Sequence, residues 1–162
     1  MITPAGKRLV APSLIDLARV VGIRRELPDR LFDLAVVGAG PAGLAAAVYA
    51  ASEGLSTLVL DRVGPGGQAG GSSLIENFIG FPGGLSGREL GLRGLLQMLK
   101  FGAALAVPFE VQSLETGGDH HLLLGREGER ARARCVLAAT GVRWKRLPAR
   151  GAVRFERAGV FY

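Results

Sequence analysis

The stretch DLAVVGAGPAGLAAAVYAASEGLSTLVLD occupies residues 33–61, and its order predicts a strand, a glycine turn, a helix and a second strand. An apolar run at 33–37 stops abruptly at G-x-G-x-x-G, formed by Gly38, Gly40 and Gly43. Small residues suited to a closely packed helix follow, and a second apolar run at 55–60 completes the unit. This βαβ order is typical of one half of a doubly wound α/β domain.

Each glycine of the turn has a separate expected role. Gly38 permits a tight turn, Gly40 lets the backbone approach a pyrophosphate, and Gly43 lets the helix press against the sheet. Pro41 suits a first helical turn, and the free amides around Ala42 offer partial positive charge to a phosphate. The alternative, that these glycines serve only close packing, is left open by the sequence.

Asp61 ends the second apolar run about 20 residues past the glycines, where an acid can accept hydrogen bonds from ribose hydroxyls. We expect Asp61 to favour a free 2′-hydroxyl over a 2′-phosphate, because two anions would repel each other. Arg62 follows directly and is the residue that could offset this preference.

Composition indicates one soluble globular domain of 162 residues, with 48% hydrophobic and 21% charged residues. Cys135 is the single cysteine, which excludes an intrachain disulfide or a C-x-x-C pair and suits a reducing cytoplasm. No apolar run approaches the ~20 residues of a membrane span. His120 and His121 lack a third ligand at metal spacing, so no metal site is expected.

The net charge of +6 is concentrated in residues 126–162, which hold ten Lys or Arg against three acids. A nucleic-acid surface is one interpretation. However, Arg130, Arg132 and Arg134 alternate with small residues, as on a strand with one solvated face. No aromatic interleaving or nucleic-acid motif accompanies them, so we expect no nucleic-acid partner.

The chain is expected to divide at residue 31. Residues 1–31 predict a short hairpin, a helix and a linker, too small to bury a core. Residues 32–162 are expected to form the main domain. Its loop after Arg62 is long, glycine-rich and partly apolar, which favours a role in wrapping a ligand or partner. Gln68 and Asn77 are the amide side chains of that loop.

A helix is predicted after Ser86, which heads a capping box, with a leucine stripe expected in the core: Leu92, Leu95, Leu96 and Leu99. Three strands, at 105–114, 120–124 and 130–137, are expected to form an antiparallel meander. The predicted fold is therefore α/β: a Rossmann-like three-layer domain with a parallel sheet plus this meander.

The last predicted strand leads into Thr140 and Gly141, and Gly141 allows a second close approach of backbone to a ligand. No acidic, basic or nucleophilic cluster suited to self-contained catalysis occurs, so no catalytic residue is assigned. Any chemistry would be carried by a cofactor.

Five segments together carry a resemblance: VVGAGPAGLAAAVYAASEGL at 36–55, PGGQ at 65–68, IENFIGFP at 75–82, SGREL at 86–90 and AATG at 138–141. With these, residues 33–162 resemble the first FAD-domain segment of thioredoxin-reductase-like, FAD-dependent pyridine nucleotide-disulfide oxidoreductases. The resemblance is nearest to a bacterial subgroup with a cyclic-nucleotide-binding module, and residues 1–24 resemble the end of its thioredoxin-like region.

The resemblance implies that FAD is the cofactor and that NADPH reduces it in such enzymes, with electrons passing to a disulfide. The residues implied to line the FAD site are Gly38, Gly40, Pro41, Ala42, Gly43, Asp61, Arg62, Gly67, Gln68, Asn77, Val111, Thr140 and Gly141. A thioredoxin-like or other redox acceptor and a homodimer are implied for the full-length protein.

In that family an NADPH domain and a second FAD-domain segment follow the point at which this sequence stops. We therefore expect a fragment of a longer reductase that is inactive alone. Two other readings stay open on the sequence: a non-catalytic Rossmann domain kept for folding or partner binding, and an NAD-binding domain. The long loop carrying Gln68 and Asn77 argues against the second of these.

Overall fold

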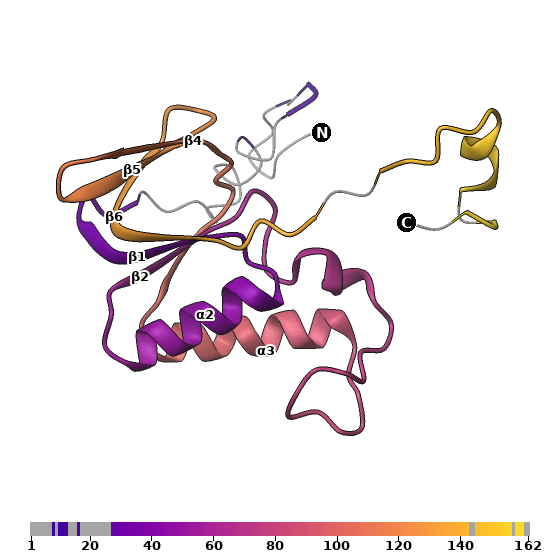
Figure 1. Ribbon diagram of the computed structural model, residues 1–162, viewed down its shortest axis with the longest axis horizontal. Helices are drawn as coiled ribbons and strands as arrows, with labels where there is room; N and C mark the ends of the chain where they lie inside the picture. Colours follow the sequence, from indigo (N-terminus) through magenta and orange to yellow (C-terminus); the bar gives the residue numbers. More distant parts are fainter. Residues whose placement is uncertain are drawn as a thin grey trace.

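The elements of the domain come from a computed structural model that describes residues 8, 10–12, 16, 27–142, 145–156 and 158–160. They are β1 Leu31–Val37, α2 Pro41–Ser52, β2 Thr57–Leu60, η1 Gly67–Gly71, α3 Gly87–Lys100, β3 Ala104–Ala106, β4 Val111–Gly117, β5 His120–Gly125, β6 Arg130–Ala138 and η2 Ala152–Phe155. The six strands form one sheet in the order β3-β2-β1-β6-β5-β4 (Figure 1). The expected hairpin and helix within 1–31 lie almost wholly outside the described residues.

The parallel half of the sheet is centred on β1. This strand runs parallel to β2 on one side and to β6 on the other, and β3 adds to the outer edge of β2. Phe32, Ala35 and Val36 of β1 are buried, so both faces of the strand are covered. A strand buried on both faces needs a continuous apolar run, which residues 34–37 supply.

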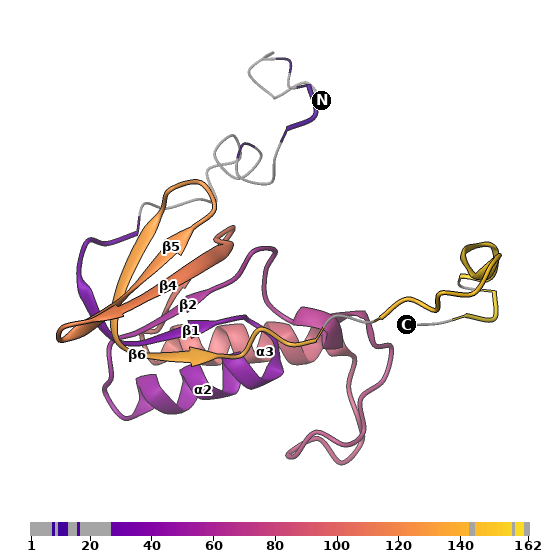
Figure 2. The same cartoon turned by 45° about the horizontal axis from the view of Figure 1, so that its top comes forward.

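Helices α2 and α3 cover one face of this sheet, as Figures 1 and 2 show from two directions. Val36 and Val59 of the sheet pack there against Leu44 and Ala47 of α2 and Met98 of α3. The small side chains of α2 let it lie close to the strands. Neither described helix is long and apolar enough to cross a membrane.

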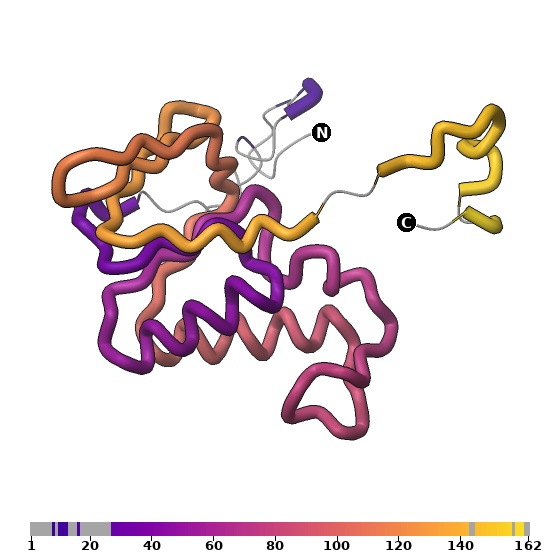
Figure 3. The backbone as a smooth tube through the Cα atoms, viewed as in Figure 1, coloured from indigo at the N-terminus to yellow at the C-terminus, as the bar shows by residue number. Residues whose placement is uncertain are grey.

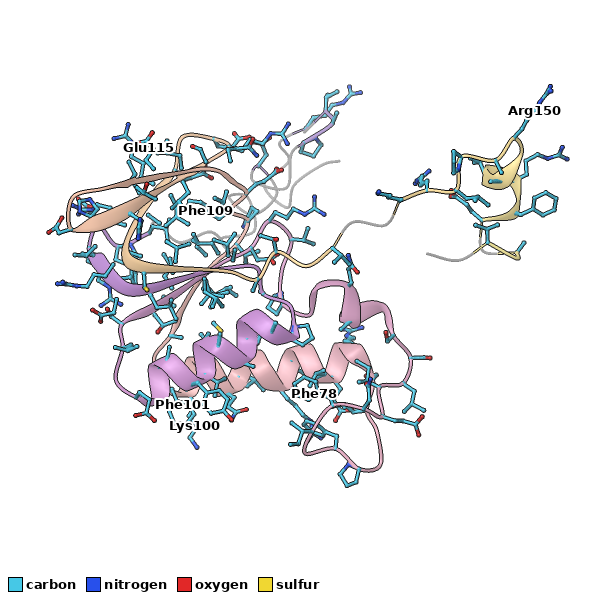
Figure 4. All side chains as sticks on the ribbon, viewed as in Figure 1. Phe78, Lys100, Phe101, Phe109, Glu115 and Arg150 are labelled. Atoms are coloured by element: carbon cyan, nitrogen blue, oxygen red, sulfur yellow. The ribbon has the colours of Figure 1, made fainter. Side chains whose placement is uncertain are left out.

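Beyond β6, strands β5 and β4 continue the same sheet as an antiparallel meander, which lies over the opposite face of the parallel strands. Phe32 and Leu58 of the parallel strands pack against Phe109, Leu123 and other residues of this layer. Figure 4 shows Phe109 between the meander and the parallel strands. The three layers, helices, parallel sheet and meander, confirm the predicted fold class.

The expected strand over 105–114 is wrong as a single element. Residues Ala104–Ala106 form β3, which pairs in parallel with β2, whereas Val111–Gly117 form β4, which pairs antiparallel with β5. Pro108 lies between the two and has no N–H with which to continue a ladder. One apolar run therefore supplies strands to two different parts of the sheet.

The leucine stripe expected in the core is also wrong for most of its members. Leu92, Leu96 and Leu99 are 53%, 58% and 47% exposed. The buried side of α3 instead combines glycines with Leu90 and Met98, and a Cβ built on Gly94 would lie 3.1 Å from Cδ1 of Leu44 in α2. Because glycine allows this close helix contact, the leucines are left on the outer side.

A polar clamp joins β1 and β2 near the edge where these strands begin. Oδ2 of Asp33 accepts hydrogen bonds from the Ser56 hydroxyl at 2.6 Å and from the Ser56 N–H at 2.9 Å. Nε of Arg134 lies 3.5 Å from Oδ1 of Asp33. The two Ser56 hydrogen bonds, with a smaller contribution from Arg134, hold the pKa of the Asp33 carboxyl below its ordinary value of 3.8.

Beyond β6 the chain leaves the three layers. Residues 145–156 and 158–160 extend away from the sheet, as the backbone trace in Figure 3 shows. Most of their side chains are exposed, so this segment adds little to the two cores.

Candidate functional site

The candidate site lies where three parallel strands end together. Val37 is in register with Leu60 of β2 and with Ala138 of β6, so the residues that follow these strands meet at one edge. The chain continues from β1 outward to β2 and β3 on one side, while β6 lies on the other. The carboxyl end of β1 is therefore a topological switch point, the position where open α/β sheets bind ligands.

Two of the three glycines in the turn are required by the protein's own packing. Gly38 has a φ of +112°, and a Cβ built on it would lie 2.2 Å from the carbonyl oxygen of Ala139. A Cβ on Gly43 would lie 1.9 Å from the carbonyl oxygen of Gly38. Any side chain at either position would force backbone apart.

Gly40 is different, because none of the described residues lies close enough to require a glycine there. Its φ of −72° and ψ of 178° suit any residue. A Cβ built on it would meet no atom closer than Cα of Gly67, at 4.0 Å. The space in front of Gly40 is therefore open, as backbone approach by a ligand would require.

The start of α2 presents unpaired amides to the same space. Gly40 caps the helix without a side-chain hydrogen bond, Pro41 occupies the first turn, and no acidic residue lies there. The first amides of a helix have no intrahelical acceptor, and the helix dipole favours an anion beside them. Ala42, within this turn, is exposed. The arrangement suits a phosphate group.

Asp61 lies beside the turn, at the end of β2. Its Oδ2 accepts a hydrogen bond from the Ala39 N–H at 2.8 Å. Its Oδ1 accepts from the N–H groups of Val63 and Gly64, each at 2.8 Å. Arg62, expected to influence ribose recognition, is exposed.

The loop after β2 returns to the glycine turn. The Gly66 N–H donates to the Ala39 carbonyl at 2.8 Å, and Gly67, with a φ of +52°, begins η1 directly opposite Gly40. A Cβ on Gly67 would lie 3.0 Å from Cα of Gly40. The structure therefore brings Gly40 and Gly67 together, although they are far apart in the sequence.

Gln68 joins this loop to the segment that follows β6. Its Nε2 donates a hydrogen bond to the carbonyl oxygen of Val142. Thr140 and Gly141 precede that residue, and Cα of Thr140 would lie 3.3 Å from a Cβ on Gly38. Both are exposed, and Gly141 has a φ of +72°. These predicted site residues surround the carboxyl end of β1.

Val111 and Asn77 lie further out. The Phe109 N–H donates to the Asp61 carbonyl at 2.8 Å, so Val111 begins β4 two residues beyond a contact with the site. Asn77 belongs to a loop closed by the paired Ile75 and Leu85, and it helps to line an open depression of about 280 Å³. Figure 1 shows this loop projecting past α3. No hydrogen bond links the described part of that loop around Asn77 to the glycine turn.

Sequence reasoning missed the buried Ala39 and the glycines on which η1 rests. Ala39 uses its N–H toward Asp61 and its carbonyl toward Gly66, contacts that leave no signature in side-chain type. A Cβ on Gly91 would lie 2.8 Å from Cα of Gly66, so α3 needs a glycine to accept the loop. Glycine inside a helix costs about 1 kcal/mol, a signal that would have pointed to this contact.

The arrangement offers amides and an acidic acceptor but no paired acid and base. Among the described residues, no three His, Cys, Asp or Glu side chains gather as a metal would need. Among the described carboxyls, the two with lowered pKa values are Asp33, which accepts hydrogen bonds from Ser56, and Asp119, which is hydrogen-bonded to His120. Asp33 lies in the clamp that joins the beginnings of β1 and β2, and Asp119 lies in the turn before β5.

Proteins of known sequence and structure share this architecture. The family model of the pyridine nucleotide-disulphide oxidoreductases matches residues 32–161. Thioredoxin reductase of Aquifex aeolicus is 35% identical over 135 residues, which cover 83% of this chain and 42% of that protein. Thioredoxin reductase of Bacillus subtilis is 34% identical over 134 residues, with the same coverage.

Solved structures of thioredoxin reductases share the fold of this chain. Thioredoxin reductase of T. acidophilum superimposes with a TM-score of 0.71 at 31% identity, covering 81% of this chain and 42% of that one. The Streptococcus pyogenes enzyme gives a TM-score of 0.67 at 33% identity, covering 73% and 38%. The chain thus spans less than half the length of these relatives. With the glycine turn at the switch point and a match over residues 32–161, the chain belongs to the pyridine nucleotide-disulphide oxidoreductase family.

Proposed function

We propose that the carboxyl edge of the parallel sheet binds FAD, and that this chain is an FAD-binding segment of a thioredoxin-reductase-like oxidoreductase. The observation that carries the proposal is Gly40: the described residues leave space for a side chain there, as the close approach of a ligand would require. An interpretation in which all three glycines serve packing alone does not account for it.

The pyrophosphate would lie against the turn formed by Gly38, Gly40 and Gly43, and would accept hydrogen bonds from the amides at Ala42 and the start of α2. Pro41 lacks an N–H and keeps that turn pre-organised. Asp61 and Arg62 would lie beside the adenosine ribose, and the backbone at Val111 beside the adenine. The residues that would line the rest of the cofactor are Gly67, Gln68, Asn77, Thr140 and Gly141.

FAD would supply the redox chemistry when bound. The role of this chain would be to bind and orient the cofactor. In the whole protein, NADPH bound to a separate domain would reduce the FAD, and a disulfide, as in thioredoxin, would accept the electrons. The relatives named thioredoxin reductase, of which this chain matches 42%, support that electron path.

Two variants test the site. Gly40→Val places a branched side chain in the space where the pyrophosphate would lie, and Gly117→Val places the same side chain at the exposed end of β4, where nothing lies within 4 Å. We expect Gly40→Val to melt like the unchanged chain but to bind FAD at least about tenfold more weakly. Gly117→Val should bind FAD as the unchanged chain does.

Affinity would be measured by quenching of FAD fluorescence, with circular dichroism as the check of folding. The absorption spectrum of the purified chain would show whether oxidised flavin co-purifies. Equal FAD affinity for Gly40→Val and the unchanged chain would refute the proposed site. Tighter binding of NAD than of FAD would instead favour the NAD-binding interpretation, and binding of neither would favour a non-catalytic domain.

The whole protein would be a homodimer that uses the outer side of α3. Leu92, Leu96 and Leu99 lie at i, i+4 and i+7, and their exposure makes a leucine stripe of the kind that helices bury against one another. An antiparallel pair of α3 helices would place Leu92 near Leu99 of the other copy. Sedimentation of the unchanged chain and of Leu96→Glu tests this, because only the unchanged chain should self-associate.

A cytoplasmic location fits the single Cys135, which is exposed and has no partner for a disulfide within the sequence. Membership of the subgroup with a cyclic-nucleotide-binding module, and the division of the chain at residue 31, stay predictions. Sequencing of the complete reading frame that encodes this chain tests both.

A further inference from the structure

We propose that Asp61 is a positioning residue for the glycine turn, acting through the amide of Ala39. This inference rests on the proposed dinucleotide site and assigns Asp61 a role beyond contact with a ribose. The observation behind it is that both carboxylate oxygens already receive backbone hydrogen bonds within the protein.

The hydrogen bonds of Asp61 leave little capacity for a ligand. A carboxylate has about four acceptor positions, two on each oxygen. Oδ1 accepts from Val63 and Gly64, and Oδ2 accepts from Ala39, all at 2.8 Å. One position on Oδ2 is left, so Asp61 can accept from one ribose hydroxyl and not from a pair.

The same hydrogen bonds fix how the turn is presented. Ala39 donates its N–H to Asp61 and accepts a hydrogen bond from the Gly66 N–H at 2.8 Å through its carbonyl. In a planar trans peptide the C=O and the next N–H point in opposite directions. The Gly40 N–H therefore points away from Gly66, and none of the described residues accepts a hydrogen bond from it.

Asp61 is itself rigidly held. Its N–H donates to the Ala106 carbonyl at 3.1 Å, and its carbonyl accepts from the Phe109 N–H at 2.8 Å. The carboxylate thus connects a fixed strand end to Ala39 on one side and to the loop at Val63 and Gly64 on the other. Holding both segments at once positions Gly40 and the approaching Gly67 before any ligand binds.

Two substitutions separate positioning from ribose contact. Asp61→Asn has one carbonyl oxygen and one NH₂ group, so it cannot accept from both sides. Asp61→Glu keeps the charge and could reach a ribose, but its longer side chain cannot keep the same hydrogen bonds to Ala39 and Val63. Asp33→Asn is the matched control, because it removes a carboxylate that accepts backbone and hydroxyl hydrogen bonds at the other end of β1.

The first measurement is amide hydrogen exchange in the chain without ligand. We expect exchange at Ala39, Val63 and Gly64 to accelerate at least about tenfold in Asp61→Asn, with Leu58 and Val59 of β2 unchanged. Asp33→Asn should leave the exchange at Ala39 unaltered. Unchanged exchange at Ala39 in Asp61→Asn would overturn the positioning role whether or not the chain binds FAD.

The second measurement is binding of FAD and of inorganic pyrophosphate, which has no ribose. Positioning predicts that both Asp61 variants bind FAD about tenfold more weakly or worse, and that Asp61→Asn also binds pyrophosphate more weakly although it has lost a negative charge. Full FAD affinity in Asp61→Glu, or full pyrophosphate affinity in Asp61→Asn, would overturn the inference. Failure of the unchanged chain to bind either probe would overturn the proposed function. Amide exchange at Ala39 would still show whether Asp61 positions the glycine turn.

Discussion

Replacing Gly43 by alanine should destabilise the fold, whereas the same change at Gly40 should not. A Cβ added to Gly43 would lie 1.9 Å from the Gly38 carbonyl oxygen and 3.2 Å from Cγ1 of Val36. Carbon and oxygen normally approach no closer than about 3.3 Å, so the turn and α2 must separate by more than about 1 Å. Backbone, unlike the end of a flexible side chain, cannot move aside at low cost.

The magnitude follows from two opposing terms at each position. Forced overpacking costs about 1–3 kcal/mol, and the upper end applies where the contact is backbone. Alanine returns about 1 kcal/mol of helix propensity at Gly43, which leaves a net loss of about 2 kcal/mol and a melting temperature lower by about 4–8 °C. At Gly40, alanine caps the helix less well than glycine, which lowers the free energy of unfolding by about 0.5–1 kcal/mol. Alanine also restricts the unfolded chain more than glycine does, and this raises the free energy of unfolding by a similar amount, so the net change is small.

The assay is urea unfolding followed by circular dichroism, with thermal melting as a second readout. The two variants share one chemical change and lie three residues apart, so differences in expression or unfolded-state composition cancel. The reasoning would be refuted if Gly43→Ala were as stable as the unchanged chain, or if Gly40→Ala lost as much stability as Gly43→Ala.

Three further outcomes are expected. The pKa of Asp33 is lowered because Ser56 donates hydrogen bonds to its carboxylate, so the carboxylate stabilises the fold above pH 3.8 and this contribution is lost as the pH falls through the folded-state pKa. The difference in unfolding free energy between the unchanged chain and Asp33→Asn, measured in urea, should therefore shrink from about pH 4 downward, and a constant difference would contradict this. Ser86→Ala removes the cap that accepts the Glu89 N–H at 3.1 Å and should cost about 1 kcal/mol in the same assay, while Ser86→Asp should restore most of it. With FAD and NADPH added, the 162-residue chain should oxidise NADPH no faster than free FAD does, because its one G-x-G-x-x-G can serve one dinucleotide and its one cysteine cannot form a redox disulfide. Clear turnover with a dye or disulfide acceptor would show that an active site is present.

The elements that could be predicted from the sequence are those specified by neighbouring residues. The strand, glycine turn, helix and strand of residues 33–61 each carry a local signal, and the structure has them as β1, α2 and β2. The signal for the start of α3 is equally local, because the Ser86 side chain caps the helix by accepting a hydrogen bond from the Glu89 N–H. Such signals depend on one turn of backbone and not on tertiary partners.

The side of α3 that is buried could not be predicted in this way. The helix carries leucines on one side and glycines with Leu90 and Met98 on another, and periodicity favours the leucines. The outcome depends on α2, whose Leu44 fits against Gly94. A pattern within one helix contains no information on the size of the side chains across from it.

Part of the candidate site was predictable for the same reason. Gly40, Asp61 and Gln68 belong to recognisable motifs, and the fold brings all three to the carboxyl end of β1 or the loop beside it. The hydrogen bonds of Ala39 and the hydrogen bond to the Val142 carbonyl could not be predicted from the sequence, because every residue carries the same main-chain carbonyl. The role expected of Asn77 stays a prediction, since its loop projects past α3.

The pairing of β1 with β6 has a consequence for how the domain folds. β1 and β2 can pair once residue 60 is available, but the other side of β1 waits for β6, where Leu31 meets Arg132. Contacts between residues so distant in sequence form slowly, because a long loop must close first. Until then β1 presents an unpaired edge of apolar residues, which can pair with another chain. Aggregation during synthesis should therefore begin at β1, and the arrival of β6 should end that risk.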